Sequence, residues 1–219
     1  MHMDGLPENN SVAISGKIVE ECVFSHEVYG EGFYTFKIAS ERLSDQADIL
    51  PVTVSERLID KSQLKIDTYV DVLGQLRSYN NYNSKKNRLV LTIFAREICL
   101  TSEEERKNQN QIFLNGFICK EPIYRKTPFG REISDVLIAV NRAYNKSDYI
   151  PCIVWGRNAR YMANLKVGEN IKVWGRVQSR TYQKKIGEKI EERIAYEVSV
   201  SKIEIPHTDE KKAEETTEE

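Results

Sequence analysis

The heptapeptide VAISGKI, residues 12–18, has a counterpart 100 residues further along the chain in IFLNGFI, residues 112–118. Extending this alignment without gaps over residues 12–57 and 112–157 gives 11 identical positions out of 46. Unrelated sequences of this composition would share roughly 6%, or about three positions. The chain therefore contains an internal repeat, and a repeat decides the domain organisation before any local pattern does.

The repeat predicts two related domains of roughly 90 residues each, at 12–100 and 112–205. Between them, residues 101–111 form a polar linker that contains the run EEERK. The last segment, 206–219, has few apolar residues and many acids, so we expect a flexible, disordered acidic tail.

The second repeat shows the clearer pattern of β-strands. Alternating or β-rich runs predict five strands, at 112–118, 134–141, 149–155, 170–182 and 194–205. A short helix is expected at 158–165, between the third and the fourth strand. Five strands with one helix in that place describe an OB-fold barrel, although the periodicity alone also permits another small barrel. The expected fold class is all-β, with two tandem OB barrels of this kind and the acidic tail.

Several short pieces of the second repeat occur in the order and spacing of a known family. They are NQIFLNG (110–116), EP (121–122), TPFG (127–130), LIAVNR (137–142) and YIPCIVWG (149–156), followed by the return through 163–175. With these pieces the repeat resembles the bacterial single-stranded DNA-binding protein (SSB) family, and the first repeat resembles it mainly through the second. The resemblance implies OB folds, here two in one chain, that bind single-stranded DNA with little regard to sequence.

Binding a single strand requires aromatic rings that stack on unpaired bases and cations that follow the phosphates. By the resemblance, four aromatic residues match stacking positions: Tyr144, Tyr149, Trp155 and Tyr182. The cations expected to contact phosphate are Arg125, Arg142, Arg157, Arg176, Arg180, Lys184 and Lys185. A secondary set comprises Tyr124 of the second repeat and Tyr79, Tyr82, Lys85 and Lys86 of the first.

The two repeats are unequal in this respect. Where the second repeat has Tyr144, Tyr149 and Trp155, the first has Ser44, Ile49 and Ser55. Residues 12–100 carry 11 basic and 12 acidic side chains, a balance of −1, whereas residues 112–205 carry 17 and 10, a balance of +7. We therefore predict that the second barrel binds nucleic acid, and that the first is a weaker binder or an assembly module.

Composition and motifs exclude several other classes of protein. No run of about 18 apolar residues predicts a membrane span, and no apolar leader is expected. The four cysteines form no C-x-x-C pair, so neither a metal nor another cofactor is expected. No nucleophile–base set indicates an enzyme. Asp48 and Asp148 recur in both repeats, and we interpret them as turn residues ahead of a strand.

The leading hypothesis is sequence-tolerant binding and protection of single-stranded DNA in replication, recombination or repair. A primosome-type OB accessory or assembly protein and an RNA-binding OB protein are the alternatives. The resemblance implies a homodimer, since two chains would present four OB domains, and a cytoplasmic, nucleoid-associated protein. Replication or repair proteins are possible partners, but the tail lacks the apolar tip that recruits them in the family.

Overall fold

The computed structural model describes residues 9–44, 46–80, 89–107, 109–187 and 189–206. Almost all regular structure in these ranges is β-strand, which confirms the expected all-β class. Among the described residues, no helix is long and apolar enough to cross a membrane. The predicted acidic tail lies outside the described residues, apart from Pro206.

Each half of the chain contributes six strands. The first half contains β1 (Asn10–Ile18), β2 (Val23–Val28), β3 (Glu31–Glu41), β4 (Ala47–Ser55), the 3₁₀ turn η1 (Lys61–Gln63), β5 (Tyr69–Asn80) and β6 (Leu89–Thr101). The second half contains β7 (Asn110–Ile118), β8 (Ile123–Lys126), β9 (Glu132–Arg142), β10 (Lys146–Trp155), the helix α1 (Arg157–Met162), β11 (Asn170–Ile186) and β12 (Lys189–Glu204).

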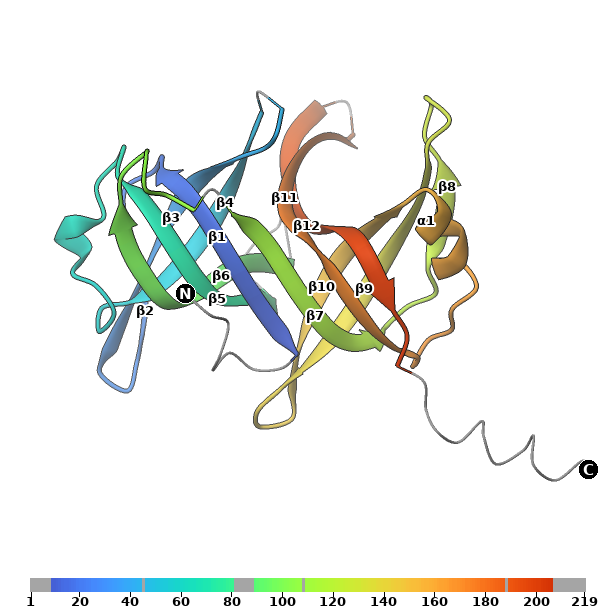
Figure 1. Cartoon of the computed structure of the whole chain (residues 1–219), viewed down its shortest axis with the longest axis horizontal. Helices are drawn as coiled ribbons and strands as arrows, with labels where there is room; N and C mark the ends of the chain where they lie inside the picture. Colours follow the sequence, from blue (N-terminus) through green and yellow to red (C-terminus); the bar gives the residue numbers. More distant parts are fainter. Residues whose placement is uncertain (1–8, 45, 81–88, 108, 188, 207–219) are drawn as a thin grey trace, which may run out of the picture.

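The strand order is the same when read from either end of the molecule. It runs β2-β3-β4-β6-β5-β1-β7-β11-β12-β10-β9-β8, so every strand of the first half is matched by its equivalent in the second. Additional pairings of β1 with β3 and of β7 with β9 close each half into a barrel (Figure 1). Within each barrel one pair is parallel, β4 with β6 and β10 with β12. Two barrels of this connectivity confirm the expected pair of OB folds.

The two barrels meet where β1 and β7 pair as antiparallel neighbours (Figure 1). In this pairing Val12 lies opposite Ile112, and these two residues are themselves equivalent in the repeat. Asn10 lies opposite Leu114 and Ile14 opposite Asn110, symmetrically on either side. A pseudo-two-fold axis therefore passes through the pair of Val12 and Ile112 and relates the two barrels.

Inward-facing branched aliphatic side chains form the core of each barrel. The first barrel buries, among others, Ile14, Ile38, Leu50, Val52, Val72 and Ile93, and the second buries Leu114, Ile138, Ile150, Val154, Val173 and Val198. These residues alternate with outward-facing ones along their strands, because successive side chains of a strand point to opposite faces. The apolar residues of the alternating pattern in the sequence thus form the interiors of the two barrels.

The structure adds one strand to the expected five in each barrel. β2 and β8 pair with the first part of β3 and β9, and all their residues are exposed. They carry no inward-facing pattern, so no periodic signal marks them in the sequence. The helix expected at 158–165 is present as α1, whereas the corresponding segment of the first half holds only η1.

The connection between the barrels is anchored to the first barrel. The Arg106 side chain forms an ion pair with Glu41 at 2.8 Å and lies over the ring of Tyr69, 4.9 Å from its centroid. Further along, the Gln109 carbonyl accepts a hydrogen bond from the Ser15 N–H at 2.7 Å. The segment therefore packs on the first barrel although its sequence is polar.

One glycine in each barrel allows two strands to approach closely at a β-bulge. The bulges interrupt β5–β6 pairing at Gly74 and β11–β12 pairing at Gly175. A Cβ atom at Gly74 would lie 2.2 Å from the carbonyl oxygen of Phe94, and one at Gly175 would lie 2.1 Å from that of Ser199. Neither backbone leaves room for a side chain, so the bulge requires glycine.

Gly175→Ala should lower the free energy of unfolding by about 1–3 kcal/mol, because the new methyl group pushes β11 away from β12. Urea denaturation measures the loss. Glu192→Ala, at an exposed position of β12, serves as the control and should change stability by less than about 0.5 kcal/mol. Equal stabilities of the two variants would contradict the close approach.

Candidate nucleic-acid interface

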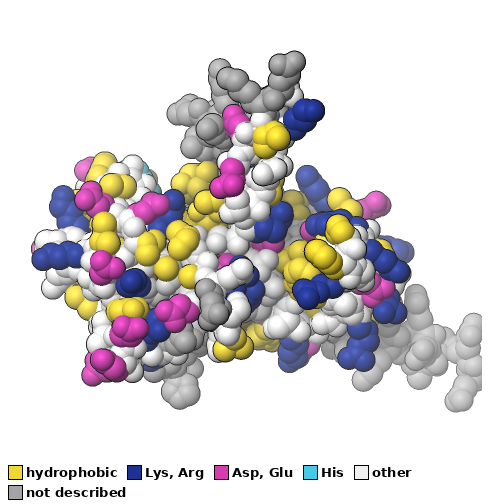
Figure 2. Space-filling model, turned by 90° about the horizontal axis from the view of Figure 1, so that it is seen from above, with side chains coloured by type: hydrophobic (Ala, Val, Ile, Leu, Met, Phe, Trp, Pro, Cys, Tyr) yellow, Lys and Arg dark blue, Asp and Glu magenta, His cyan; other side chains and the backbone are white. Residues whose placement is uncertain are grey.

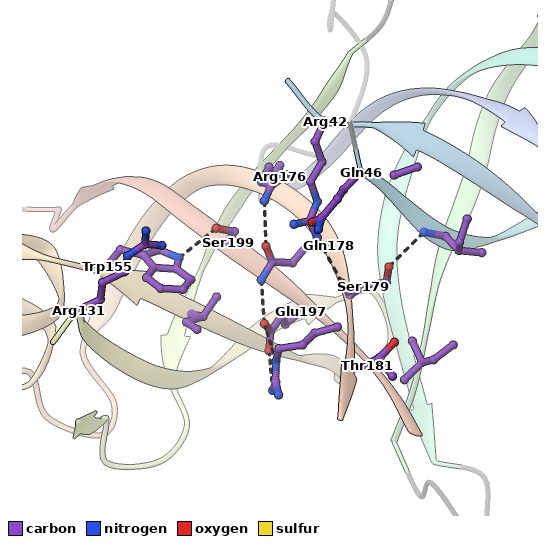
Figure 3. A pocket seen from close by; sticks show the side chains of 15 residues that line it. Arg42, Gln46, Arg131, Trp155, Arg176, Gln178, Ser179, Thr181, Glu197 and Ser199 are labelled. Atoms are coloured by element: carbon purple, nitrogen blue, oxygen red, sulfur yellow. Dashed lines mark hydrogen bonds and ion pairs between the residues drawn. The ribbon is translucent and has the colours of Figure 1, made fainter. Parts of the chain in front are cut away.

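A groove of about 770 Å³ runs along the second barrel where the first barrel meets it. Figure 3 shows Trp155 and Arg131 on one side of this groove and Arg42 of the first repeat on the other. The lining residues are Arg42, Gln46, Ala47, Ile49, Arg131, Ile153, Trp155, Arg176, Gln178, Ser179, Arg180, Thr181, Ile194, Glu197 and Ser199. We call it the Trp155 groove. Its walls come from both repeats.

Trp155 supplies the aromatic surface of this groove. It is the last residue of β10, and the positive φ of 60° at Gly156 turns the chain into α1 directly afterwards. The indole N–H donates a hydrogen bond to the Ser199 hydroxyl on β12 at 3.1 Å. The side chain remains 38% exposed. The ring is thus fixed by its polar edge while part of its apolar surface faces solvent, as base stacking requires.

Alternate residues of β11 bring polar and cationic groups into the groove. The guanidinium of Arg180 pairs with Glu197 at 3.3 Å, and the Gln178 amide donates to the same carboxylate at 2.8 Å. Across the groove, Arg131 is exposed and makes no ion pair within the described part of the chain. Its positive charge is therefore available to an anionic ligand.

Asp48 ties the first barrel to the edge of this groove. Its carboxylate is fully buried on β4 and accepts two hydrogen bonds from Arg42 of the same repeat, at 2.8 and 2.6 Å. It also accepts the backbone N–H of Ser179 at 2.8 Å and pairs with Arg176 at 3.5 Å, both from the second repeat. The hydrogen bonds to Asp48 raise the pKa of Arg42.

Asp148 makes the equivalent connection in the opposite direction. It is fully buried on β10 and accepts the backbone N–H of Ser78 at 2.7 Å. It pairs with Arg142 of its own repeat at 3.3 Å and with Arg77 of the first repeat at 3.4 Å. The interpretation of the two aspartates as turn residues is therefore wrong: both lie within strands and join the barrels.

The hydroxyl groups of two serines complete this junction. Ser179 accepts the N–H of Ile49 at 3.1 Å, and Ser78 accepts the N–H of Tyr149 at 2.7 Å. A Gln–Arg contact accompanies each junction, but its order along the strand differs. In β5 the sequence is Gln75-x-Arg77, whereas at the equivalent positions of β11 it is Arg176-x-Gln178. The two junctions thus make equivalent contacts between the barrels, although their sequences differ.

Of the predicted site residues, the Trp155 groove brings together Trp155, Arg176 and Arg180. Tyr182 follows Arg180 on the same face of β11, and the two side chains touch, with the guanidinium carbon 5.7 Å from the ring centroid. Arg142 does not reach this groove, because it belongs to the Asp148 junction. Trp155, Arg176 and Arg180 thus share a groove whose walls come from both repeats.

The remaining predicted residues lie elsewhere on the surface. Tyr144 is 94% exposed in the turn between β9 and β10, and Tyr149 is beside Ser78 at the other junction. The others that the structure describes but does not place in the Trp155 groove are Tyr124, Arg125, Arg157, Lys184, Lys185 and Tyr79. Tyr82, Lys85 and Lys86 lie outside the described residues.

Two of these outlying side chains have partners within the barrel. The Tyr124 hydroxyl donates to Glu132 at 2.7 Å, and this hydrogen bond raises the pKa of Tyr124. Arg125 pairs with Asp135 at 2.7 Å, and the hydrogen bond raises the pKa of Arg125. Both pairs are at the surface, where such contacts exchange readily with solvent or a ligand.

Sequence reasoning missed the contribution of the first repeat to the groove, which comes from Arg42 and Gln46 among others. Arg131, directly before β9, belongs to the basic residues that the sequence places around the site. The alignment of the two repeats places an arginine at both 42 and 142, but nothing in the sequence shows that each arginine faces the other barrel.

Charge is distributed unevenly over the two lobes. On the face in Figure 2, Lys and Arg side chains gather around hydrophobic ones on the lobe to the right, while acids are scattered over the lobe to the left. The right-hand lobe is the second repeat in Figure 1. Within the described residues, no group of three His, Cys, Asp or Glu side chains is placed to hold a metal ion. The arrangement therefore offers rings and cations rather than metal ligands.

Comparison with known proteins identifies the family. The model of the single-strand binding protein family matches residues 109–206. The single-stranded DNA-binding protein of Clostridium tetani is 35% identical over 98 residues, which is 41% of this chain and 68% of that protein. The chain belongs to the single-strand binding protein family. Membership rests on the second repeat, where the matched residues lie.

Other members of the family show the same pattern of similarity. Single-stranded DNA-binding protein A of Bacillus subtilis is 35% identical over 88 residues, 37% of this chain and 51% of that protein. The chain spans about half the length of the first curated relatives it matches. The crystal structure of the single-stranded DNA-binding protein from Thermus aquaticus superposes on both repeats, with a TM-score of 0.73 and 17% identity over 91% of this chain and 93% of that one. This likeness extends the family fold to the first repeat.

Asp48→Ala should lower the free energy of unfolding by about 3–5 kcal/mol, because it leaves Arg42, Arg176 and the Ser179 N–H without the buried carboxylate that they share. Asp135→Ala removes the surface partner of Arg125 and is the matched control, with an expected loss below about 1 kcal/mol. Urea denaturation of both variants checks the difference. Similar losses would mean that Asp48 does not hold the barrels together.

Proposed function

We propose that the chain binds single-stranded DNA with little sequence preference and protects it during replication, recombination or repair. One observation carries this proposal: the Trp155 groove presents a fixed, partly exposed indole beside cationic side chains on a barrel of the family fold. Binding, rather than catalysis, is the role such a surface supports, because rings and cations recognise a strand without reacting with it.

In the proposed complex, an unpaired base stacks on Trp155 and the adjoining phosphates pass along the cationic wall of the groove. Arg131 has no competing ion pair among the described residues, so it is the first candidate for phosphate contact. Arg180 is held by Glu197 and would have to share its guanidinium between that carboxylate and a phosphate. Stacking gives affinity for any base, and the charge makes binding depend on salt.

The proposal includes a contribution from the first repeat. Arg42 and Gln46 line the groove, and Arg42 is held there by the Asp48 carboxylate of its own repeat and by the Ser179 carbonyl of the second. The intact chain should therefore bind more tightly than residues 109–206 in isolation. The division of the chain into domains at 12–100 and 112–205, joined by 101–111, is part of the same proposal.

We further propose that the chain forms a homodimer and acts in the cytoplasm, on the nucleoid. Closed two-fold dimers are the commonest assemblies of soluble proteins, and a dimer would present four barrels to one strand. Such an assembly would have twice the 25.3 kDa mass of one chain, which sedimentation or native mass spectrometry measures. A mass of 25.3 kDa at micromolar concentration would contradict the dimer.

Trp155→Ala should weaken binding of oligo(dT) by about 5- to 150-fold, because one stacked base contributes about 1–3 kcal/mol. Fluorescence anisotropy of a labelled oligonucleotide measures the change.

Arg131→Ala should lower the slope of log affinity against log salt by about 0.7, the value for one phosphate contact on a single strand.

Trp174→Phe is the control for the first variant. Trp174 lies outside the groove. The centroid of its ring is 4.9 Å from that of Phe113 and 4.4 Å from the ammonium nitrogen of Lys202. Its replacement should leave the affinity unchanged. If Trp155→Ala binds as tightly as Trp174→Phe, the groove is not the DNA site.

Matched oligo(rU) should bind more weakly than oligo(dT), and the reverse order would favour an RNA ligand.

A further inference from the structure

One acidic side chain lies among the arginines of the Trp155 groove. Of the 15 described residues that line the groove, four are arginines and Glu197 is the single carboxylate. Glu197 lies on β12, two residues before Ser199, which is the hydrogen-bond partner of Trp155. A negative charge at this place repels phosphate, so Glu197 opposes the binding that the arginines favour.

The first barrel has a groove at the equivalent place, which shows what the fold itself requires there. Its volume is about 470 Å³, and Phe94 of β6 is one of its lining residues. The register of the two parallel strand pairs relates the grooves: Thr53 lies opposite Phe94, and Ile153 lies opposite Ser199. Because residues 53 and 153 are equivalent in the repeat, Phe94 corresponds to Ser199.

Two residues earlier on the same strands, Thr92 corresponds to Glu197. The hydroxyl of Thr92 shares a hydrogen bond of 2.8 Å with the hydroxyl of Thr53, and this neutral contact occupies the position in the first barrel. The described residues that line the first groove include no carboxylate. The barrel therefore forms without an acid at this position, and Glu197 is a feature of the second groove alone.

Hydrogen bonds hold the carboxylate of Glu197 in place. Glu197 is 7% exposed, and it accepts a hydrogen bond from the side-chain amide of Gln178 at 2.8 Å. Gln178 in turn accepts a hydrogen bond from Arg176 at 3.2 Å, and Arg176 pairs with Asp48 at the junction of the barrels (Figure 3). The negative charge is thus fixed in the lining of the groove.

The contact between Glu197 and Arg180 is looser. The Nε and Nη2 atoms of Arg180 lie 3.3 and 3.4 Å from the two carboxylate oxygens, whereas strong charge-assisted hydrogen bonds measure about 2.7–2.9 Å. Arg42 reaches Asp48 at 2.6 and 2.8 Å by comparison. The Arg180 side chain is 48% exposed, and its fork of N–H donors also suits a phosphate. Arg180 can therefore exchange the carboxylate for a phosphate.

The charge of Glu197 also reaches a second arginine that the sequence predicts as a phosphate contact. Arg125 of β8 pairs with Asp135, and the hydrogen bond between them raises the pKa of Arg125. The charges of Asp135 and Glu197 add to this rise in the pKa. One carboxylate thus acts on two of the cations that the second barrel presents.

We propose that Glu197 is a built-in competitor of DNA phosphate, whose carboxylate holds Arg180 in the place of a phosphate and thereby lowers the affinity of the Trp155 groove. The proposal rests on the proposed function and adds to it a residue that opposes binding. A strand must take Arg180 from the carboxylate before its phosphate can pair there, and the carboxylate takes the guanidinium back when the strand leaves. The groove therefore releases a strand more easily than its four arginines alone would allow.

Glu197→Gln removes the charge and keeps an oxygen that can accept the hydrogen bond from Gln178. The variant should bind oligo(dT) about 3- to 10-fold more tightly, because Arg180 no longer has to leave a charged partner. The slope of log affinity against log salt should become steeper by about 0.7, the value for one further phosphate contact on a single strand. Fluorescence anisotropy titrations at a series of salt concentrations measure both quantities.

Glu191→Gln is the matched control. Glu191 lies on the same strand, pairs with Arg193 at 3.1 Å and does not line the groove. This variant changes the net charge of the chain by the same amount, so it should alter the affinity by less than about 2-fold and leave the salt slope unchanged. If Glu197→Gln binds no more tightly than Glu191→Gln, Glu197 is not a competitor.

An Arg180→Ala background distinguishes competition for this arginine from general repulsion of the strand. In this background the gain in affinity from Glu197→Gln should fall to less than half of its value in the wild type, because the group for which the two anions compete is missing. An equal gain in both backgrounds would overturn the proposal.

Glu197→Thr repeats the test with the residue that the first barrel has at this position. Urea denaturation shows which variants are folded, and each folded variant should bind more tightly than the wild type. Weaker binding by a folded variant would mean that Glu197 positions Arg180 for the phosphate, which overturns the proposal. A wild-type chain that fails to bind oligo(dT) overturns the proposed function as well. A wild-type chain that binds, while neither variant binds more tightly, overturns the competitor alone.

Discussion

Two buried carboxylates set the arrangement of the whole molecule. A carboxylate removed from water must find cations and N–H donors, or its burial costs several kcal/mol. Asp48 and Asp148 each find one arginine in their own repeat and a backbone N–H in the other. Such directional partners fix how one barrel is placed against the other, in addition to the antiparallel pairing of β1 with β7. Both grooves owe their mixed walls to this placement.

Much of the fold follows from the sequence because it depends on local alternation and on the repeat. The strands expected at 134–141 and 149–155 lie within β9 and β10, and Trp155 lines a groove at the end of β10. Strands β2 and β8 have no buried face, so no alternation marked them. The helix of the first half is reduced to η1, a difference that an alignment of the apolar positions does not reveal.

The site was harder to predict than the fold, for a physical reason. A groove is a surface to which neighbouring strands contribute, whereas an alignment compares residues one position at a time. Replacement of Trp155 by Ser55 therefore looks like a loss, although Phe94 fills the same region from the adjacent strand. Counting charge by repeat misleads in the same way. Arg142 is counted with the second repeat but lines the groove of the first, and Arg42 does the reverse.

The reversed order of Gln75-x-Arg77 and Arg176-x-Gln178 points to what a covalent pair of barrels permits. In an assembly of identical one-barrel subunits, any substitution changes every copy of the surface at once. Here each half of the pseudo-symmetric pair is encoded separately, so a change in one barrel can be answered by a change beside it without touching the other. Evolution can then adjust the two surfaces one at a time, and a single chain can acquire two grooves of different charge while keeping one shared junction.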